Sequence, residues 1–198
     1  MKNFLDAKFP GRIYPINPKY PDLMGLKCYQ RVSDAPGNVD CVIIATPAET
    51  VPEIVEDCVK KKVGGIIVLS GGFEEVNRND LASNIKKMVD DAEIPLIGPN
   101  CLGVFNPYSK VDSIFLPRYK LERPKAGGIA FVTQSGAVGS TVMDLTAFYG
   151  MGMSKFISYG NSTVLDESDY LEYLMYDNET KVIILYLEGA KDGRKLLE

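Results

Sequence analysis

The sequence of 198 residues contains no histidine and no tryptophan, and it has only four cysteines. Without histidine, this chain cannot by itself supply a Ser-His-Asp triad, a histidine-ligated zinc site or a phosphohistidine. The cysteines form no C-x-x-C pair, which argues against zinc ribbons and thioredoxin-like redox motifs. We expect them to be buried, reduced thiols of a cytosolic protein; they are Cys28, Cys41, Cys58 and Cys101.

Long apolar runs and a basic charge balance are absent as well. The longest apolar runs, such as residues 182–187, are about six residues long, and a membrane helix needs about 20. A charge interrupts the first residues before a signal-peptide-like stretch can form. Lys and Arg number 22 against 26 Asp and Glu, so the net charge is −4. We therefore expect no membrane partner and no nucleic-acid partner.

Short apolar runs alternate with segments of helical period, which predicts an α/β fold with parallel sheets. The expected strands lie at residues 12–17, 40–45, 66–69, 94–97, 128–132, 156–158 and 182–187. Residues 104–125 break the rhythm and are interpreted as a connector with one short strand near 111–116. This division predicts two domains, residues 1–122 and 123–198.

Two local patterns predict helix starts. Thr50 and Glu53 have the spacing of a capping box ahead of an apolar helical face. The acidic run at residues 166–169 is expected to cap and begin a helix, because acidic side chains favour the first turn of a helix. We do not interpret this run as a metal site.

Four polar turns follow apolar runs, at residues 17–19, 45–48, 70–72 and 98–101. In doubly wound sheets, ligands bind beyond the carboxyl ends of the strands. Together the turns offer one ammonium group, several hydroxyls, a carboxamide and glycine backbone that a ligand can approach closely. These groups suit a phosphorylated organic ligand such as a nucleotide-bearing cofactor, and ordinary turns are the alternative.

A sharper signal lies at residues 133–139, where a strand, a small polar turn and a helix follow one another. Ser135 and Gly136 fall at the helix start, where free N–H groups and the helix dipole can bind an anion. A serine N-cap with a glycine for close packing is the alternative. Glu188 ends the last apolar strand and should face the same edge, unless it is an ordinary solvated acid.

Five blocks together resemble the nucleoside-diphosphate-forming acyl-CoA synthetases. The similarity is to the α-type part of ADP-forming acetyl-CoA synthetase and to the succinyl-CoA synthetase α subunit. It covers nearly the whole chain, in the order and spacing of that family. The blocks are residues 13–19, 42–48, 97–103, 131–137 and 181–189.

The resemblance implies a Rossmann-like parallel-sheet CoA-binding domain followed by a flavodoxin-like α/β domain. It implies CoA as the cofactor, with ADP or ATP and Mg bound only at an ATP-grasp partner. The reaction implied is acyl-CoA, ADP and phosphate giving carboxylate, CoA and ATP, by way of an acyl phosphate and a phosphorylated histidine.

The resemblance also implies roles for particular residues. The expected CoA-binding residues are Pro18, Lys19, Thr46, Pro47, Ser70, Gly71, Asn100 and Cys101. The phosphate site would be formed by Gln134, Ser135, Gly136 and Ala137. Glu188 would be the catalytic glutamate that orients the histidine. No metal ligand is expected in this chain.

The sequence departs from the family at both ends. The family begins with a strand and a glycine-rich turn, and its histidine follows the Leu-Glu-Gly strand; this sequence contains neither. We therefore expect a first domain without its first strand and an incomplete second domain. Such a chain would be inactive alone and would need an ATP-grasp β subunit or domain and a histidine-bearing C-terminal segment.

Other interpretations remain open. A non-catalytic CoA-binding or regulatory module and an inactive remnant are the alternatives. A plain Rossmann dinucleotide-binding protein is disfavoured because no G-x-G-x-x-G is present. Missing sheet edges make a homo-oligomer plausible.

The resemblance places the missing strand between the strand ending at Asn17 and the strand ending at Ala45. Its loss would leave unpaired backbone on both neighbours, which costs free energy. We therefore expect residues 13–16 and 41–45 to pair directly, or another chain to fill the space.

Overall fold

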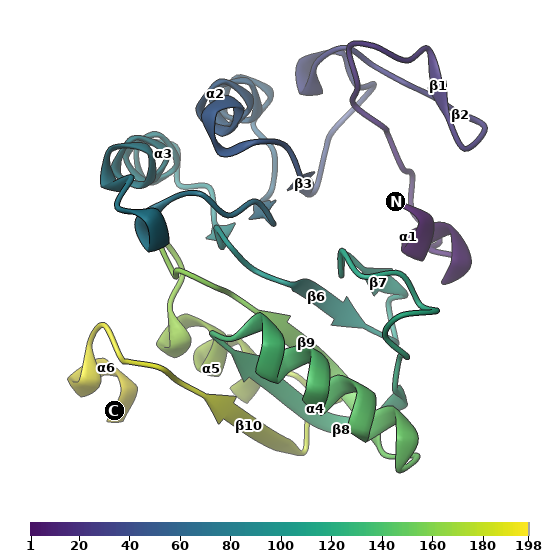
Figure 1. Cartoon of the computed structure of the whole chain (residues 1–198), viewed down its shortest axis with the longest axis vertical. Helices are drawn as coiled ribbons and strands as arrows, with labels where there is room; N and C mark the ends of the chain where they lie inside the picture. The colour runs from purple at the N-terminus through teal and green to yellow at the C-terminus, as the bar shows by residue number, and fades with distance from the viewer. Residues whose placement is uncertain (198) are drawn as a thin grey trace.

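Figure 1 shows the computed structural model, which describes residues 1–197 in two α/β units. The first unit has a three-stranded sheet of order β3-β4-β5, and the second has a five-stranded sheet of order β10-β8-β9-β6-β7. A small hairpin of β1 (Asp22–Leu23) and β2 (Leu26–Lys27) stands apart. The predicted α/β class is confirmed. No helix within residues 1–197 has the length and apolar surface needed to cross a membrane.

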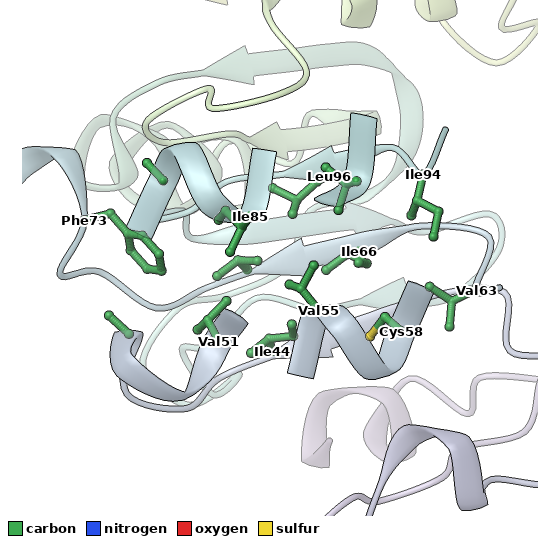
Figure 2. Packing of buried hydrophobic residues seen from close by; sticks show 14 of the residues in the cluster. Ile44, Val51, Val55, Cys58, Val63, Ile66, Phe73, Ile85, Ile94 and Leu96 are labelled. Atoms are coloured by element: carbon green, nitrogen blue, oxygen red, sulfur yellow. The ribbon is translucent and has the colours of Figure 1, made fainter. Parts of the chain in front are cut away.

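The first sheet is parallel and consists of β3 (Val42–Ile44), β4 (Ile66–Val68) and β5 (Leu96–Ile97). Helices α2 (Val51–Lys61) and α3 (Asn79–Asp91) cover one face of it, as Figure 2 shows. The side chains buried between helices and sheet include Ile44, Val51, Val55, Cys58, Ile66, Val68, Phe73, Ile85 and Leu96. Burial of these apolar side chains, at about 25 cal/mol per Å², fixes the helices on the sheet.

The predicted capping box at the start of α2 is wrong. Thr50 is the N-cap residue, but its side chain makes no capping hydrogen bond. A short 3₁₀ turn, η2 (Ala48–Thr50), precedes the helix, and Thr50 Oγ1 donates instead to Pro47 O at 2.8 Å. Thr50 Oγ1 also lies 2.8 Å from Thr46 Oγ1. The helix start is therefore tied to the turn that follows β3.

The second sheet has three parallel strands, β8 (Lys125–Thr133), β9 (Gly152–Ser158) and β10 (Val182–Tyr186). Helices α4 (Gly136–Phe148) and α5 (Glu167–Met175) cover opposite faces. Alternation along β8 explains this arrangement, because Phe131 packs in the cluster under α4 while Ala130 and Val132 pack in the cluster under α5. Asp166 caps α5 with the expected acidic first turn, and α6 (Gly193–Leu197) follows β10.

Residues 104–125 contain more regular structure than the sequence predicted. β6 (Gly103–Asn106) and β7 (Val111–Asp112) form an antiparallel pair, and β6 also pairs antiparallel with β9. Strands this short carry too few alternating positions to be recognised from periodicity. By hydrogen bonding, residues 103–112 lie with the second sheet, although they precede the boundary expected at residue 122.

The N-terminal segment does not pair with β3, so the expectation of direct pairing is wrong. Ile16 makes only an isolated parallel bridge, to Tyr29, so residues 12–17 are not the predicted strand. In α1 (Lys2–Asp6), Asn3 Nδ2 donates to Ile114 O at 2.6 Å. These two attachments hold the segment away from β3. A cavity of about 730 Å³ lies between the segment and β3.

A buried ion pair supports the region between the two sheets. The side chain of Asp112 is fully buried, and Arg123, 2% exposed, donates to it from Nε at 3.0 Å. Arg118 Nη2 donates to the same carboxylate at 3.0 Å. Arg123 also donates to Leu116 O at 2.8 Å, which ties the connector to β7.

We expect Asp112→Asn to lower the free energy of unfolding by about 3–5 kcal/mol, because it leaves a buried guanidinium without its counter-charge. Urea unfolding followed by circular dichroism measures the change. The matched control is Asp91→Asn, which removes an exposed pair with Lys87 and should cost about 0–1 kcal/mol. Equal effects of the two substitutions would contradict this account.

Candidate functional site

Three of the predicted turns meet beyond the carboxyl ends of β3, β4 and β5. Ser70 Oγ donates to Thr46 O, and Asn100 N donates to Ser70 O at 2.8 Å. Pro47 follows Thr46 at the start of η2. At Gly71 a Cβ would come within 3.1 Å of Asn100 Oδ1, so the lack of a side chain keeps this turn close to its neighbour. The structure therefore brings Thr46, Pro47, Ser70, Gly71 and Asn100 together.

No hydrogen bond within residues 1–197 joins the fourth predicted turn to these three. Pro18 and Lys19 are exposed, and Lys19 N donates to Asn17 Oδ1 at 2.9 Å. The ammonium group of Lys19 makes no ion pair or hydrogen bond with any residue from 1 to 197. It is therefore an exposed positive charge that is available to a ligand.

Cys101 differs from its expected placement. The side chain is 3% exposed, and its Sγ donates to Val68 O at 3.3 Å. Burial raises the pKa of the Cys101 thiol to about 12. The thiol therefore belongs to the core below the turn, and only the backbone of this residue remains near the edge.

The start of α4 has the geometry of an anion site. Ser135 is the N-cap residue, and its Oγ accepts a hydrogen bond from Val138 N at 3.3 Å. Gly139 N donates to Ser135 O at 2.9 Å. The N–H groups of Gly136 and Ala137 have no acceptor within the described residues. Two free donors at the positive end of the helix dipole favour a bound anion.

Gln134 connects this helix start to Glu188. Its Oε1 accepts hydrogen bonds from Glu188 N and from Gly189 N, the latter at 3.1 Å, and its Nε2 donates to Gly189 O at 3.1 Å. The connection is possible because β8 and β10 are parallel neighbours whose carboxyl ends coincide. The carboxylate of Glu188 is exposed and has no partner among residues 1–197.

Two residues that sequence reasoning missed join the two units. Asn161 Nδ2 donates to Glu75 Oε2 at 2.6 Å, and Asn161 Oδ1 accepts from Asn100 Nδ2 at 3.2 Å. Glu75 Oε1 accepts from Gly72 N and from Phe73 N, the latter at 3.2 Å. Glu75 lies in η3 (Glu74–Val76). Acidic residues in such a turn are usually solvent-exposed, so the sequence did not indicate that Glu75 joins the two units. Asn161 could have been found, because it follows a predicted strand as the other site turns do.

Two buried polar side chains lie below the Glu188 turn. Glu167 is fully buried, and its Oε1 accepts from Lys191 N at 3.1 Å. Tyr159 is also fully buried, and its hydroxyl has no partner within the described residues. Burial, together with the negative charges of Glu167, Asp166 and Glu188, raises the pKa of Tyr159 well above its ordinary value. Sequence reasoning saw Glu167 only as part of a helix start.

Comparison with known families gives two matches. Residues 1–107 match the family described as CoA binding domain, and residues 126–198 match the family described as succinyl-CoA ligase like flavodoxin domain.

Curated relatives and solved structures agree with these matches. An acetate–CoA ligase [ADP-forming] of Methanocaldococcus jannaschii is 41% identical over 99% of this chain, and its counterpart I in Archaeoglobus fulgidus is 42% identical over 100%. This chain spans 27% and 28% of their lengths. The solved acetyl-coenzyme A synthetase 1 of Ca. Korarchaeum cryptofilum superposes with a TM-score of 0.92 at 36% identity, covering 98% of this chain and 41% of that one.

We expect Gln134→Ala to release the Glu188 turn, because it removes three hydrogen bonds worth about 1 kcal/mol each. Hydrogen–deuterium exchange at the amides of Glu188 and Gly189 should become roughly tenfold faster or more. Gln134→Glu retains acceptor oxygens and should preserve most of the protection. Unchanged exchange in Gln134→Ala would show that the turn is held by other contacts.

Glu75 should make the junction of the two units sensitive to acid. Partial burial raises the pKa of Glu75, but hydrogen bonds from Asn161, Gly72 and Phe73 outweigh it and hold that pKa below its ordinary 4.5. A lowered pKa in the folded state means that the stabilisation is present above pH 4.5 and is lost as the pH falls through the folded-state pKa.

Urea unfolding from pH 6 to pH 3 tests this sign. Glu75→Gln should be less stable than wild type at pH 6, by about 1 kcal/mol or less because the side chain is exposed. The two stability curves should converge near pH 3. Glu56→Gln on α2 is the control, since within residues 1–197 Glu56 pairs with exposed Lys60 alone. A difference that grows on acidification would overturn the assignment.

Proposed function

The chain belongs to the CoA-binding-domain family, and we propose that it is the CoA-binding and phosphate-holding portion of an ADP-forming acyl-CoA synthetase. Membership confirms the resemblance seen in the sequence. It also confirms the predicted fold, a Rossmann-like CoA-binding part followed by a succinyl-CoA-ligase-like flavodoxin part. The activity proposed is that of a longer assembly, of which this chain matches about a quarter in the curated relatives cited.

One observation carries the proposal: the Asn100–Asn161–Glu75 hydrogen bonds join turns of the first sheet to the turn after β9 of the second. These turns, together with the start of α4 after the neighbouring strand β8, are called the polar edge. A ligand with a phosphorylated end and a reactive end can therefore lie across both units. CoA has this form, with its phosphates at one end and its thiol at the other.

The residues of the first unit would bind CoA. Lys19 would supply an ammonium group for a CoA phosphate, because it has no hydrogen-bond or ion-pair partner among residues 1–197. Thr46, Pro47, Ser70 and Gly71 would flank the nucleotide or the pantetheine. Asn100 would lie toward the thiol, while Pro18 shapes the lysine turn.

The residues of the second unit would hold phosphate. The free N–H groups of Gly136 and Ala137 would donate to its oxygens, with Ser135 and Gln134 fixing the helix start. The chemistry is transfer of the acyl group from CoA to phosphate, followed by transfer of the phosphoryl group through a histidine to ADP. Glu188, held by Gln134, would orient that histidine.

The proposal requires groups that this sequence does not contain. It has no histidine, so a histidine-bearing segment must supply one, and an ATP-grasp domain or β subunit must bind ADP and Mg. A relative in Pyrococcus furiosus, 37% identical to this chain, is named as a subunit alpha, which supports a partner subunit. The four unpaired cysteines support a cytoplasmic location.

Titration of the purified chain with CoA by calorimetry tests the CoA site. We expect binding that Lys19→Ala weakens about tenfold, because a charge-assisted contact to a phosphate is lost. Lys87→Ala, on the exposed surface of α3, is the control and should bind as wild type does. No binding at millimolar CoA, or equal binding by both variants, would contradict the proposed site.

A further inference from the structure

The loop that carries Glu188 is held by side chains. Residues 188–191 link β10 to α6, and within residues 1–197 they take part in no backbone–backbone hydrogen bond. The pairing of β10 with β8 ends at Tyr186, two residues before Glu188. The position of the Glu188 carboxylate therefore depends on the side chains that bind this loop.

Gln134 holds the first end of the loop, and Glu167 holds the second. Gln134 Oε1 accepts hydrogen bonds from Glu188 N and from Gly189 N, the latter at 3.1 Å. Glu167 Oε1 accepts from Lys191 N at 3.1 Å. The two side chains come from different elements, since Gln134 follows β8 and Glu167 begins α5. Both ends of the loop are thus fixed to the body of the second unit.

Packing alone does not account for a glutamate at the second position. Glu167, Tyr170 and Leu174 have the spacing of one helical face, and all three are buried. Glu167 forms no ion pair with any residue from 1 to 197. A buried carboxylate without a counter-charge loses its hydration, so an apolar side chain would be less costly here.

The carboxylate of Glu167 is committed to the loop. Glu167 is the first residue of α5, where the positive end of the helix dipole offsets part of the cost of burying its charge. Its Oε2 has no hydrogen-bond partner among the described residues. The bond from Lys191 N is therefore the one hydrogen bond that this carboxylate makes within residues 1–197.

The other contacts near this loop use exposed side chains. Lys191 Nζ donates to Ser162 O, but the residue is exposed and a lysine side chain loses much rotamer freedom when it is held. Lys195 Nζ, also exposed, lies 2.7 Å from Asp169 Oδ1. Exposed pairs of this kind contribute little. Glu167 thus provides the buried contact between the start of α5 and the segment that follows Glu188.

We propose that Glu167 is a positioning residue for Glu188, which it holds in place through the hydrogen bond from Lys191 N. The inference rests on the proposed function, in which the Glu188 carboxylate orients a histidine. A group with that role must keep its place to within about 0.5 Å, and the residues that support it provide this precision. Glu167 and Gln134 together supply the support, and the buried charge is its cost.

Glu167→Leu separates positioning from stability. Leucine is close in size to glutamate and removes the buried charge, so the urea midpoint should equal or exceed that of wild type. Hydrogen–deuterium exchange at the amides of Glu188 and Lys191 should nevertheless become about tenfold faster or more. Unchanged exchange at Glu188 would overturn the proposal. A lower midpoint with faster exchange throughout α5 and β10 would assign Glu167 a structural role and would also overturn it.

Two further variants identify the contact responsible. Glu167→Gln retains an acceptor oxygen for Lys191 N and should restore most of the protection at Glu188. Lys191→Ala removes the ammonium contact with Ser162 but keeps the backbone N–H, so exchange at Glu188 should stay within about twofold of wild type. Exchange as fast as that of Glu167→Leu in either variant would overturn the proposal.

The backbone order parameter of Glu188, measured by NMR relaxation, gives a second readout. It should fall from about 0.85 towards about 0.6 in Glu167→Leu and remain high in Glu167→Gln. An unchanged order parameter in Glu167→Leu would show that Glu188 keeps its place without Glu167 and would reject the role. None of these measurements contains CoA, so their failure is distinguishable from a failure of the CoA titration.

Discussion

The hydrogen bonds that join the turn after β9 to the turns of the first sheet hold the candidate site together. Besides the side-chain contacts of Asn161, the backbone donates from Asn161 N to Pro99 O at 3.0 Å and from Thr163 N to Gly98 O at 3.1 Å. Parallel strands bring their carboxyl ends to one edge within each sheet, but nothing in that rule aligns the edges of two sheets. These bonds provide the alignment, and without them the two halves of the polar edge would be separate sites.

The sequence was sufficient wherever a feature depended on local pattern. The strands and helices of the first sheet, the start of α4 and the position of Glu188 all follow from periodicity or from the ends of apolar runs. It was insufficient where partners lie far apart in the chain, as Glu75 and Asn161 do. The prediction from sequence was also wrong at the start of α2. The hydroxyl of Thr50 was expected to cap the helix, but it donates to Pro47 O in the preceding turn instead.

Stability and function use different groups in this molecule. The apolar clusters and the Asp112–Arg123 pair lie in the interior, where their side chains are buried. The turns at the carboxyl ends of the strands carry mainly short polar side chains that form hydrogen bonds with the backbone. These bonds fix the conformation of the turns without burying charged groups. Cys101 marks the division, because its thiol belongs to the core while its neighbour Asn100 belongs to the edge. Substitutions on the edge should therefore change binding more than folding.

The free strand edges of the two sheets differ in how far they are exposed. β10 ends the second sheet with Val182 and Ile184 partly exposed, so its free edge faces solvent. The free edge of β3 faces a cavity enclosed by α1, residues 12–16 and the connector. An exposed strand edge can pair with strands of other molecules, and covering it with another part of the chain prevents this. The backbone groups of Ile43 face away from β4, because Val42 N and Ile44 O make the bonds to that strand. The enclosure of the β3 edge therefore limits the pairing of Ile43 with other molecules.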